Sequence, residues 1–313
     1  MTVEYTNGVL RTTQTEQEAV NPVVARLLKR GFIRRVYSLS GGEQFELTPA
    51  GHQYVADYEA LRSEYEDVSI LRSLSLQELQ IRRAQIARVS LIIPALNEAR
   101  NIGILLPSIE EYVPGMSEIM VVNGTSTDGT DQIAQELGAT VLSQLGTGKG
   151  DALRRGFTAP HIGDIIVIMD ADGSNRAQEI PALVNALAKK GVDIAKGSRF
   201  LKGGGSTDLT RIRRIGNKVF VSLVNLIWGG DYTDLCYGFM AFRREALERL
   251  IPVLESNYFQ IEAEICIKAK KLGLKVVEVP SVELKRRHGE SKLRGARDSF
   301  QIFKAILSEA FGK

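Results

Sequence analysis

The stretch from Asp164 to Gly173 constrains the fold of this 313-residue chain more than any other segment does. Its apolar run, Ile165 to Met169, is mostly β-branched, which is typical of a strand buried on both faces of a parallel sheet. The run stops at two carboxylates, Asp170 and Asp172. Ligands of open α/β sheets bind at the carboxyl ends of the strands, so the pattern predicts a site at this edge.

The two carboxylates of that stretch are hard oxygen ligands. They suit a Mg²⁺ or Mn²⁺ ion that carries a diphosphate. An isolated Asp-x-Asp is also compatible with a strand that ends in a solvated turn, so the neighbouring segments have to decide between the two interpretations.

From Val89 onward the chain alternates between strand-like and helix-like segments. Such alternation predicts right-handed crossovers and an α/β fold, with a mostly parallel sheet and helices on both faces. The expected strands are 89–93, 119–122, 140–142, 165–169 and 193–196, and the expected helices are 101–112, 128–137, 149–157 and 179–190. Polar loops that follow these strands should therefore converge beside the carboxylate pair.

An ordered set of motifs lies on those strand ends, and it is more specific than any one member. The set comprises Val89–Glu98, Ser126–Thr130, Gly148–Gly150, Asp170–Asp172 and Gly197–Arg199, followed by Tyr232–Phe239 and Gly289–Leu293. Together these motifs resemble family 2 glycosyltransferases with the Rossmann-like GT-A fold, most closely the dolichol-phosphate mannosyltransferase-like branch. The resemblance covers Val89 to about Phe303.

The resemblance implies transfer of a sugar from a nucleotide diphosphate donor with inversion at the anomeric carbon. Asp172 would hold Mg²⁺ or Mn²⁺ bridging both phosphates, and so would neutralise the leaving group. Asp170 would meet the donor ribose or the water shell of the ion.

Further donor-site residues follow from the same resemblance. Pro94, Ala95 and Glu98 would frame the nucleoside, and Lys149 and Arg199 would lie at the nucleotide-sugar. Asn123 stands where the family usually has a carboxylate that accepts a hydrogen bond from the base imide. Because an amide can both accept and donate, UDP- and GDP-linked donors both remain open.

Asp234 is the candidate acceptor-side residue and could deprotonate an acceptor hydroxyl as a general base. A phosphate acceptor is already ionised and would need no base, and a structural cap is the alternative role for this carboxylate. Glu262 and Glu264 lie close by in a helix, and Glu264 is the one expected to face the site.

One dense basic cluster follows residue 284. The resemblance implies that this loop closes over the donor diphosphate and an acceptor phosphate, because guanidinium groups bind such oxygens in pairs. A solvated basic surface is the alternative. The candidate residues are Arg286, Arg287, His288, Ser291 and Lys292.

Residues 1–85 are predicted to form a separate α+β module, ahead of a transferase domain at 86–313. Residues 1 to about 20 are polar and are expected to be a loose arm. A helical pattern at 22–29, a hairpin signal at 32–47 and a helix starting at Thr48–Pro49 resemble the second half of a winged-helix domain. Too little chain precedes Pro22 for the first two helices of that fold, so an interaction or dimerisation module is favoured over DNA binding.

Composition excludes little by itself. The net charge of +3, from 40 basic and 37 acidic residues, does not favour nucleic acid. Cys236 and Cys266 lack metal-ligand spacing and are expected to be reduced, which indicates a cytosolic chain. No apolar run is long enough to span a bilayer.

The segment Ser299 to Phe311 has one apolar helical face. Basic residues near it favour peripheral contact with an anionic membrane, whereas Asp298 and Glu309 weaken that electrostatic case. Packing on the protein itself or on a second copy of the chain is the alternative.

The leading functional hypothesis is therefore a metal-dependent glycosyltransferase that acts on a polyprenyl phosphate at a membrane surface. Its rival is the same chemistry on a soluble acceptor, such as a nucleoside or a phosphorylated metabolite. A DNA-binding regulator with a degenerate transferase domain is the remote alternative, and the intact Asp170 and Asp172 pair argues against it.

Every donor-side motif lies after Val89, so a chain that starts near Arg83 should bind the donor as tightly as the full chain does. Calorimetric titration of nucleotide-sugar into both proteins measures this. Loss of binding by a truncated protein that still melts cooperatively would show that residues 1–85 complete the donor site.

Overall fold

The computed structural model describes residues 3–6, 9–12, 33–37, 43–47, 88–113, 116–160, 163–290 and 295–311. The chain divides into two compact units, Met1–Ser73 and Leu74–Lys313. The predicted boundary at 85/86 lies outside the described residues and stays a prediction.

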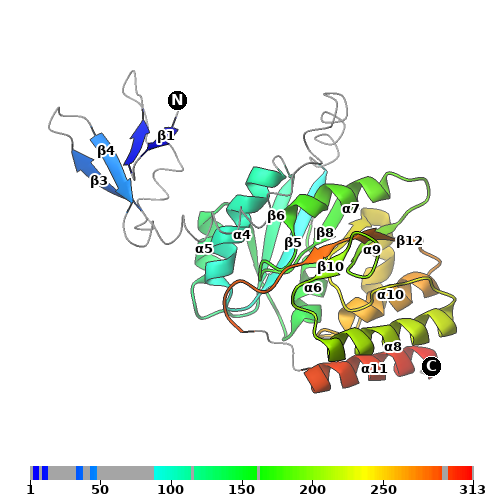
Figure 1. Ribbon diagram of the computed structural model, residues 1–313. Coiled ribbons are helices and arrows are strands. Elements are labelled where there is room, and N and C mark those ends of the chain that lie inside the picture. Colours follow the sequence, from blue (N-terminus) through cyan, green and yellow to red (C-terminus); the bar gives the residue numbers. More distant parts are fainter. Residues whose placement is uncertain are drawn as a thin grey trace. The chain divides into compact units, whose positions relative to one another are not determined.

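The larger unit is built on a seven-stranded sheet with the order β12-β9-β11-β8-β5-β6-β7 (Figure 1). All neighbours pair in parallel except β11, which is antiparallel to both β8 and β9. The predicted mostly parallel sheet is thus confirmed. Its strands are β5 (Val89–Ala95), β6 (Glu118–Asn123), β7 (Thr140–Ser143), β8 (Ile165–Ile168), β9 (Ile194–Ser198), β11 (Met240–Arg243) and β12 (Val276–Pro280).

The strand that precedes the carboxylate motif, β8, lies inside the sheet, as predicted, between β11 and β5. Strand β11 was not among the predicted strands, because its short apolar run, Met240 to Phe242, is compatible with either a helix or a strand. A separate two-stranded parallel sheet joins β10 (Gly205–Ser206) to β13 (Val282–Glu283).

Helices cover both faces of the large sheet, as predicted (Figure 1). One face carries α4, α5 and α7, and the other carries α6, α8, α9, α10 and α11. The helices are α4 (Ala99–Tyr112), α5 (Thr130–Glu136), α6 (Lys149–Phe157), α7 (Ile180–Leu187), α8 (Arg211–Trp228), α9 (Arg244–Leu250), α10 (Ile261–Lys271) and α11 (Gly295–Phe311), with short 3₁₀ turns η2 (Ala177–Glu179) and η3 (Ile251–Val253).

The period-two alternation of strand side chains explains the two cores. In β8, Ile166 and Ile168 pack in the core beneath α6 and α10, whereas Val167 packs in the core beneath α4 and α7. All three side chains are buried. A continuous apolar strand is therefore required at this place, which is what the sequence of β8 supplies.

The smaller unit contains a four-stranded antiparallel sheet with the order β1-β2-β4-β3. The strands are β1 (Val3–Thr6), β2 (Val9–Thr12), β3 (Ile33–Tyr37) and β4 (Glu43–Leu47). The predicted hairpin at 32–47 is confirmed, but the predicted loose arm is wrong for β1 and β2. Two β-rich runs flank Asn7-Gly8, the strongest short hairpin signal, and this signal was missed. The helices predicted at 22–29 and after Thr48 lie outside the described residues.

Within the part of the chain that the structure describes, no helix is both long enough and apolar enough to cross a bilayer. Cys236 and Cys266 are both free thiols, as expected.

Truncating Phe242 should test the core at β11, since its ring is fully buried and packs edge-on against Phe157 with centroids 5.8 Å apart. We expect Phe242→Ala to lower the free energy of unfolding by about 3–5 kcal/mol in urea denaturation. The matched control is Phe311→Ala, because Phe311 is exposed and should change stability by less than about 0.5 kcal/mol. Equal effects of the two substitutions would contradict the assigned core.

Candidate active site

A cavity of about 760 Å³ opens at the carboxyl ends of β5, β8 and β9. The starts of α6, α8, α10 and α11 and the loop after β13 complete its wall. Six of the predicted donor-site residues line it: Pro94, Ala95, Glu98, Lys149, Asp170 and Arg199. Asp172 and Arg286 line it as well, so the structure brings the predicted metal-binding carboxylates and part of the basic cluster to one place.

Lys149 joins two acidic side chains at the centre of the cavity. Its Nζ lies 2.5 Å from Asp170 Oδ1 and 2.7 Å from Glu262 Oε1. Burial alone would lower the pKa of Lys149, but the charges of Asp170 and Glu262 outweigh it and raise that pKa. The ammonium group therefore keeps its charge and holds Asp170 in place.

The glycines beside Lys149 explain how it reaches this position. A Cβ at Gly148 would lie 2.3 Å from the carbonyl oxygen of Asn257, and one at Gly150 would lie 2.2 Å from that of Ser256. Gly148 also has a φ of +94°. Only glycine at positions 148 and 150 allows the start of α6 to contact the loop before α10 this closely. This contact brings Lys149 to Glu262.

Glu262 rather than Glu264 faces the cavity, so the expectation for Glu264 is wrong. The Glu264 carboxylate instead accepts hydrogen bonds from the backbone N–H groups of Glu255 (2.9 Å) and Ser256 (3.0 Å). Two residues along a helix rotate a side chain by more than half a turn, so the two glutamates point to different sides. Burial raises the pKa of the Glu262 carboxyl, and the nearby Lys149 opposes this shift.

Asp172 is paired with a cation from the basic loop. Arg286 places Nη2 3.2 Å from Asp172 Oδ2, while its Nη1 donates to Glu98 Oε1 (2.8 Å) and Oε2 (3.0 Å). One guanidinium group thus bridges the loop after β5 and the loop after β8. Positive charge is favoured beside Asp172, where the predicted divalent ion would bind.

The residues around Asp172 fit a metal ion that arrives with a diphosphate. Among the described residues, no cluster of three or more His, Cys, Asp or Glu side chains could hold an ion alone. Mg²⁺ is commonly held by one or two carboxylates together with substrate phosphates and water, so Asp172, with Asp170 and Ser174 beside it, matches that ligand set.

Asn123, which was predicted to meet the base of the donor, does not line the cavity, whereas the nearby Gln144 does. Asn123 Oδ1 accepts a hydrogen bond from Ser126 N (3.2 Å), and Asn123 is not part of the cavity wall. Gln144, one residue beyond β7, does line the cavity and donates from Nε2 to the carbonyl of Gly148 (2.8 Å). No sequence motif marked Gln144.

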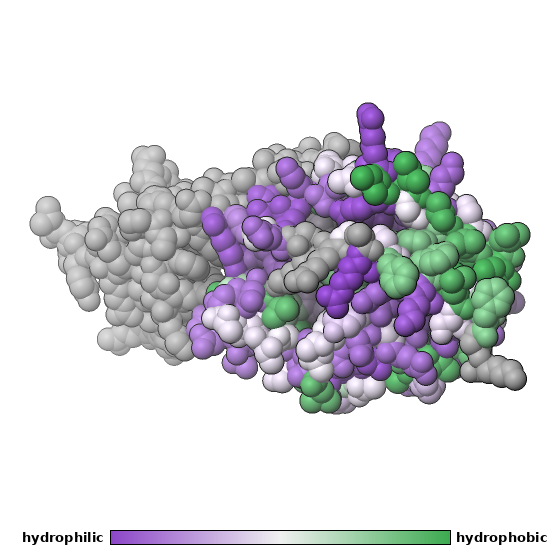
Figure 2. Space-filling model, turned by 90° about the horizontal axis from the view of Figure 1, so that it is seen from below, coloured by the Kyte–Doolittle hydropathy of each residue, from purple (hydrophilic) through white to green (hydrophobic). Residues whose placement is uncertain are grey.

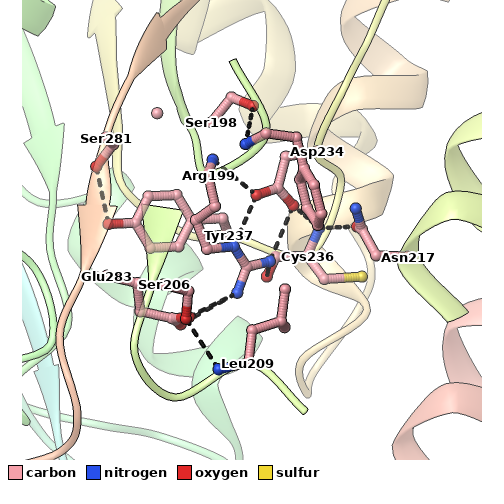
Figure 3. Close-up of polar contacts among 12 residues, drawn as sticks. Ser198, Arg199, Ser206, Leu209, Asn217, Asp234, Cys236, Tyr237, Ser281 and Glu283 are labelled. Atoms are coloured by element: carbon pink, nitrogen blue, oxygen red, sulfur yellow. Dashed lines mark hydrogen bonds and ion pairs between the residues drawn. The ribbon is translucent and has the colours of Figure 1, made fainter. Parts of the chain in front are cut away.

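Arg199 lies at the centre of a buried ionic network on the other side of the cavity (Figure 3). Its Nε and Nη2 donate to the two oxygens of Asp234, at 2.7 and 2.9 Å. Its Nη1 donates to both oxygens of Glu283 at 3.1 Å, and its guanidinium carbon lies 4.9 Å from the ring centroid of Tyr237. Arg199 therefore fastens β9, the loop before β11 and β13 to one another.

Asp234 is turned toward Arg199 and not toward the cavity. It is fully buried and does not belong to the cavity wall. Burial would raise the pKa of its carboxyl, but Lys196 and Arg199 outweigh burial and lower it below the ordinary 3.8. This geometry favours the structural alternative, and the general-base role stays a prediction.

Arg287 and His288 of the basic cluster do not line the cavity. Arg287 donates its backbone N–H to the carbonyl of Asp172 (3.3 Å), and the carbonyl of His288 accepts from Asn101 Nδ2 (3.1 Å). These backbone contacts hold the loop near β8 and α4. Ser291 and Lys292 lie outside the described residues.

Comparisons with known proteins agree with this geometry. The model of the family described as glycosyl transferase family 2 matches residues 90–251. The chain is 31% identical to glycosyltransferase AglJ of Haloferax volcanii, over 71% of this chain and 72% of that protein. It is 38% identical to the dolichol-phosphate mannosyltransferase of Pyrococcus furiosus, over 66% of this chain and 60% of the relative.

A solved structure also resembles the chain. Glucosyl-3-phosphoglycerate synthase from Mycobacterium tuberculosis, in complex with Mn²⁺, UDP and glucosyl-3-phosphoglycerate, superposes with a TM-score of 0.60 at 25% identity. The match covers 76% of this chain and 85% of that one. The fold predicted from the sequence is therefore the fold of a protein that was solved in complex with a metal ion and a nucleotide.

Removing the charge of Asp234 should destabilise the fold, because it leaves the buried Arg199 only partly paired. We expect Asp234→Asn to lower the free energy of unfolding by about 3–5 kcal/mol at pH 7 in urea denaturation. The folded pKa lies below 3.8, so this difference should persist down to about pH 4 and shrink as the pH falls further.

The matched control is Asp208→Asn, whose carboxylate pairs with Arg213 at 3.1 Å but is about a third exposed. Its loss should change stability by no more than about 1 kcal/mol. An Asp234→Asn protein as stable as the control would show that the network is not required for the fold.

Proposed function

Because the chain belongs to glycosyl transferase family 2 and is a glycosyltransferase, we propose that it moves a hexose from a nucleoside diphosphate to a polyprenyl phosphate. The observation that carries this proposal is the composition of the cavity described above. Its carboxylate end suits a metal-bound diphosphate, and its other end is lined by apolar residues of α8 and by basic side chains.

The donor would bind with its diphosphate beside Asp172, in the region that Arg286 now bridges. Arg286 would then release Asp172 and bind the phosphate oxygens instead. A guanidinium group can bind carboxylate oxygens and phosphate oxygens in the same paired geometry. Pro94 and Ala95 would frame the nucleoside, with Gln144 or Asn123 near the base. Lys149 and Asp170 would stand beside the sugar or the ribose.

A bound Mg²⁺ or Mn²⁺ would offset the negative charge that the diphosphate gains as it leaves. In the reaction, an acceptor oxygen forms the new bond to the anomeric carbon. The bond from that carbon to the β-phosphate oxygen breaks, and its electron pair remains on the nucleoside diphosphate. Attack from the opposite side gives inversion. Arg286 and Lys149 hold their positive charges near the departing phosphates.

The acceptor end of the cavity supports a lipid phosphate. Leu209, Ile212 and Phe220 supply apolar surface for an isoprenoid chain, and Arg213 and Arg297 supply charge for its phosphate. A phosphate oxygen is already ionised, so it needs no general base. That chemistry agrees with an Asp234 that is committed to Arg199.

Relatives give the same proposal separate support. The Pyrococcus furiosus protein is named for transfer of mannose to dolichol phosphate. A soluble phosphorylated metabolite is the second candidate, because the solved structure described above contains glucosyl-3-phosphoglycerate. Its acceptor phosphate could use the same basic residues, but it would leave the apolar part of the cavity unfilled.

Transfer should depend on Asp172 and on a divalent ion. We expect Asp172→Ala, or excess EDTA with the intact protein, to lower the transfer rate by about 10²-fold or more, because the leaving-group charge is no longer neutralised. The assay uses labelled GDP-mannose and UDP-glucose with polyprenyl phosphate in detergent, or with 3-phosphoglycerate, and measures the products by chromatography.

The matched control is Asp231→Ala, whose side chain is 90% exposed and lies outside the cavity wall, so its transfer rate should be unchanged. Full activity in EDTA would contradict the metal-dependent mechanism. Transfer to 3-phosphoglycerate but not to the lipid would decide for the second candidate.

A further inference from the structure

Helix α8 presents a continuous apolar stripe to solvent. Ile212, Ile215, Val219 and Leu226 follow one another at intervals that keep them on one side of the helix. They are 83%, 65%, 49% and 82% exposed. Such large apolar side chains, gathered on one helix face, are typical of an interaction surface.

Helix α11 presents a second stripe of the same kind. Phe300, Phe303, Leu307 and Phe311 share one side of the helix, and Phe300 and Phe311 are 66% and 82% exposed. The prediction of an apolar face on this segment is thus confirmed. The sequence pattern alone did not predict the matching stripe on α8, because α8 also carries buried apolar residues.

The two helices lie side by side (Figure 1) and bury their opposite faces in one core. Phe220 and Val224 of α8 and Ile302 and Ile306 of α11 belong to that core. The exposed stripes are therefore additional to the core and are not needed by it. Figure 2 views the molecule from the side on which α8 and α11 lie, and apolar residues gather over that part of the surface.

The charges around these stripes are almost all positive. Helix α8 has no acidic residue, and its exposed basic residues Arg211, Arg214 and Lys218 flank the stripe. On α11 the exposed Arg297 and Lys304 flank the stripe, whereas Asp298 is buried. Glu309 is held by Lys268 and Lys271, each at 2.7 Å. Asp298 and Glu309, whose negative charges would oppose contact with an anionic membrane, are therefore buried or paired and do not face the surface that carries the stripes.

The cavity reaches this same surface. Ile212 belongs both to the exposed stripe of α8 and to the cavity wall, and Arg297 at the start of α11 lines the cavity as well. A ligand held at the carboxylate end could therefore extend along apolar residues to the exposed face.

We propose that the α8–α11 face, defined by the two stripes and their flanking basic residues, binds the surface of an anionic membrane. Apolar side chains enter the interface while lysine and arginine bind the lipid headgroups. The proposal rests on the proposed function only in that a polyprenyl phosphate would enter the cavity from this face. In a two-fold symmetric dimer the same face would meet itself and oppose like charges, which disfavours a second copy as the occupant.

Vesicle co-sedimentation of the full chain tests the proposal. We expect binding to vesicles of phosphatidylglycerol and phosphatidylcholine in equal parts at low salt, and little binding at about 0.5 M salt, where the Debye length falls to a few ångströms. Vesicles of phosphatidylcholine alone should bind much less protein. No donor or acceptor is present.

Two double variants separate the apolar and the electrostatic contributions. Ile215→Ser with Phe300→Ser, and Arg211→Glu with Lys218→Glu, should each weaken the vesicle partition coefficient about tenfold or more. None of these four residues lines the cavity. Unchanged thermal unfolding would show that each variant is folded.

Matched controls change the same chemistry elsewhere. Leu145→Ser removes an apolar side chain that is 82% exposed outside the face, and Lys189→Glu with Lys190→Glu reverses two exposed charges after α7. Both controls should bind vesicles as the intact protein does.

Absence of binding by the intact protein at low salt would overturn the proposal, as would binding that neither double variant weakens. A dimer in sedimentation velocity that Ile215→Ser with Phe300→Ser dissociates, without vesicle binding, would assign the face to a second copy. If the protein transferred sugar to polyprenyl phosphate in detergent but did not bind vesicles, the proposal for the α8–α11 face would be overturned and the proposed function would stand. Vesicle binding without such transfer would instead overturn the proposed function.

Discussion

Three basic side chains, each bridging two carboxylates from distant segments, hold the carboxyl edge of the sheet together. Lys149 joins Asp170 to Glu262, Arg199 joins Asp234 to Glu283, and Arg286 joins Glu98 to Asp172. A buried charge is costly without a partner, so each bridge fixes the position of two loops at once. The rest of the site depends on these contacts, because they set where each carboxylate points.

The three bridges differ in how they would respond to a ligand. Arg199 is nearly inaccessible and fully paired, so it serves the fold. Arg286 is more exposed, and a metal-bound diphosphate could compete for both it and Asp172. Lys149 lies between these extremes, since it is enclosed by Asp170 and Glu262 yet lines the cavity. The cavity thus has a buried, fully paired guanidinium group on one side and, on the other, a more exposed ion pair that a ligand could replace.

Helices α8 and α11 connect the fold to the proposed lipid acceptor. Their inner faces complete one of the two cores, and their outer faces remain apolar although the core does not need them. Lys268 and Lys271 of α10 draw Glu309 away from the outer face. The contact between α10 and α11 therefore leaves the basic residues as the main charges on the outer face of these helices.

The sequence by itself determined the alternation of strands and helices from Val89 to about residue 196 and the place expected for the site at the sheet edge, while the family resemblance implied the roles of Asp170, Asp172 and Lys149. It could do so because strand burial and motif order are local properties of the chain. Only the tertiary structure decided which side chains meet. The absence of Asn123 from the cavity wall, the presence there of Glu262 instead of Glu264, and the burial of Asp234 against Arg199 all depend on contacts between segments far apart in sequence. The spacing of apolar residues in a sequence cannot specify such contacts. They depend on how each helix is rotated about its axis and on how side chains pack once the helices lie against the sheet.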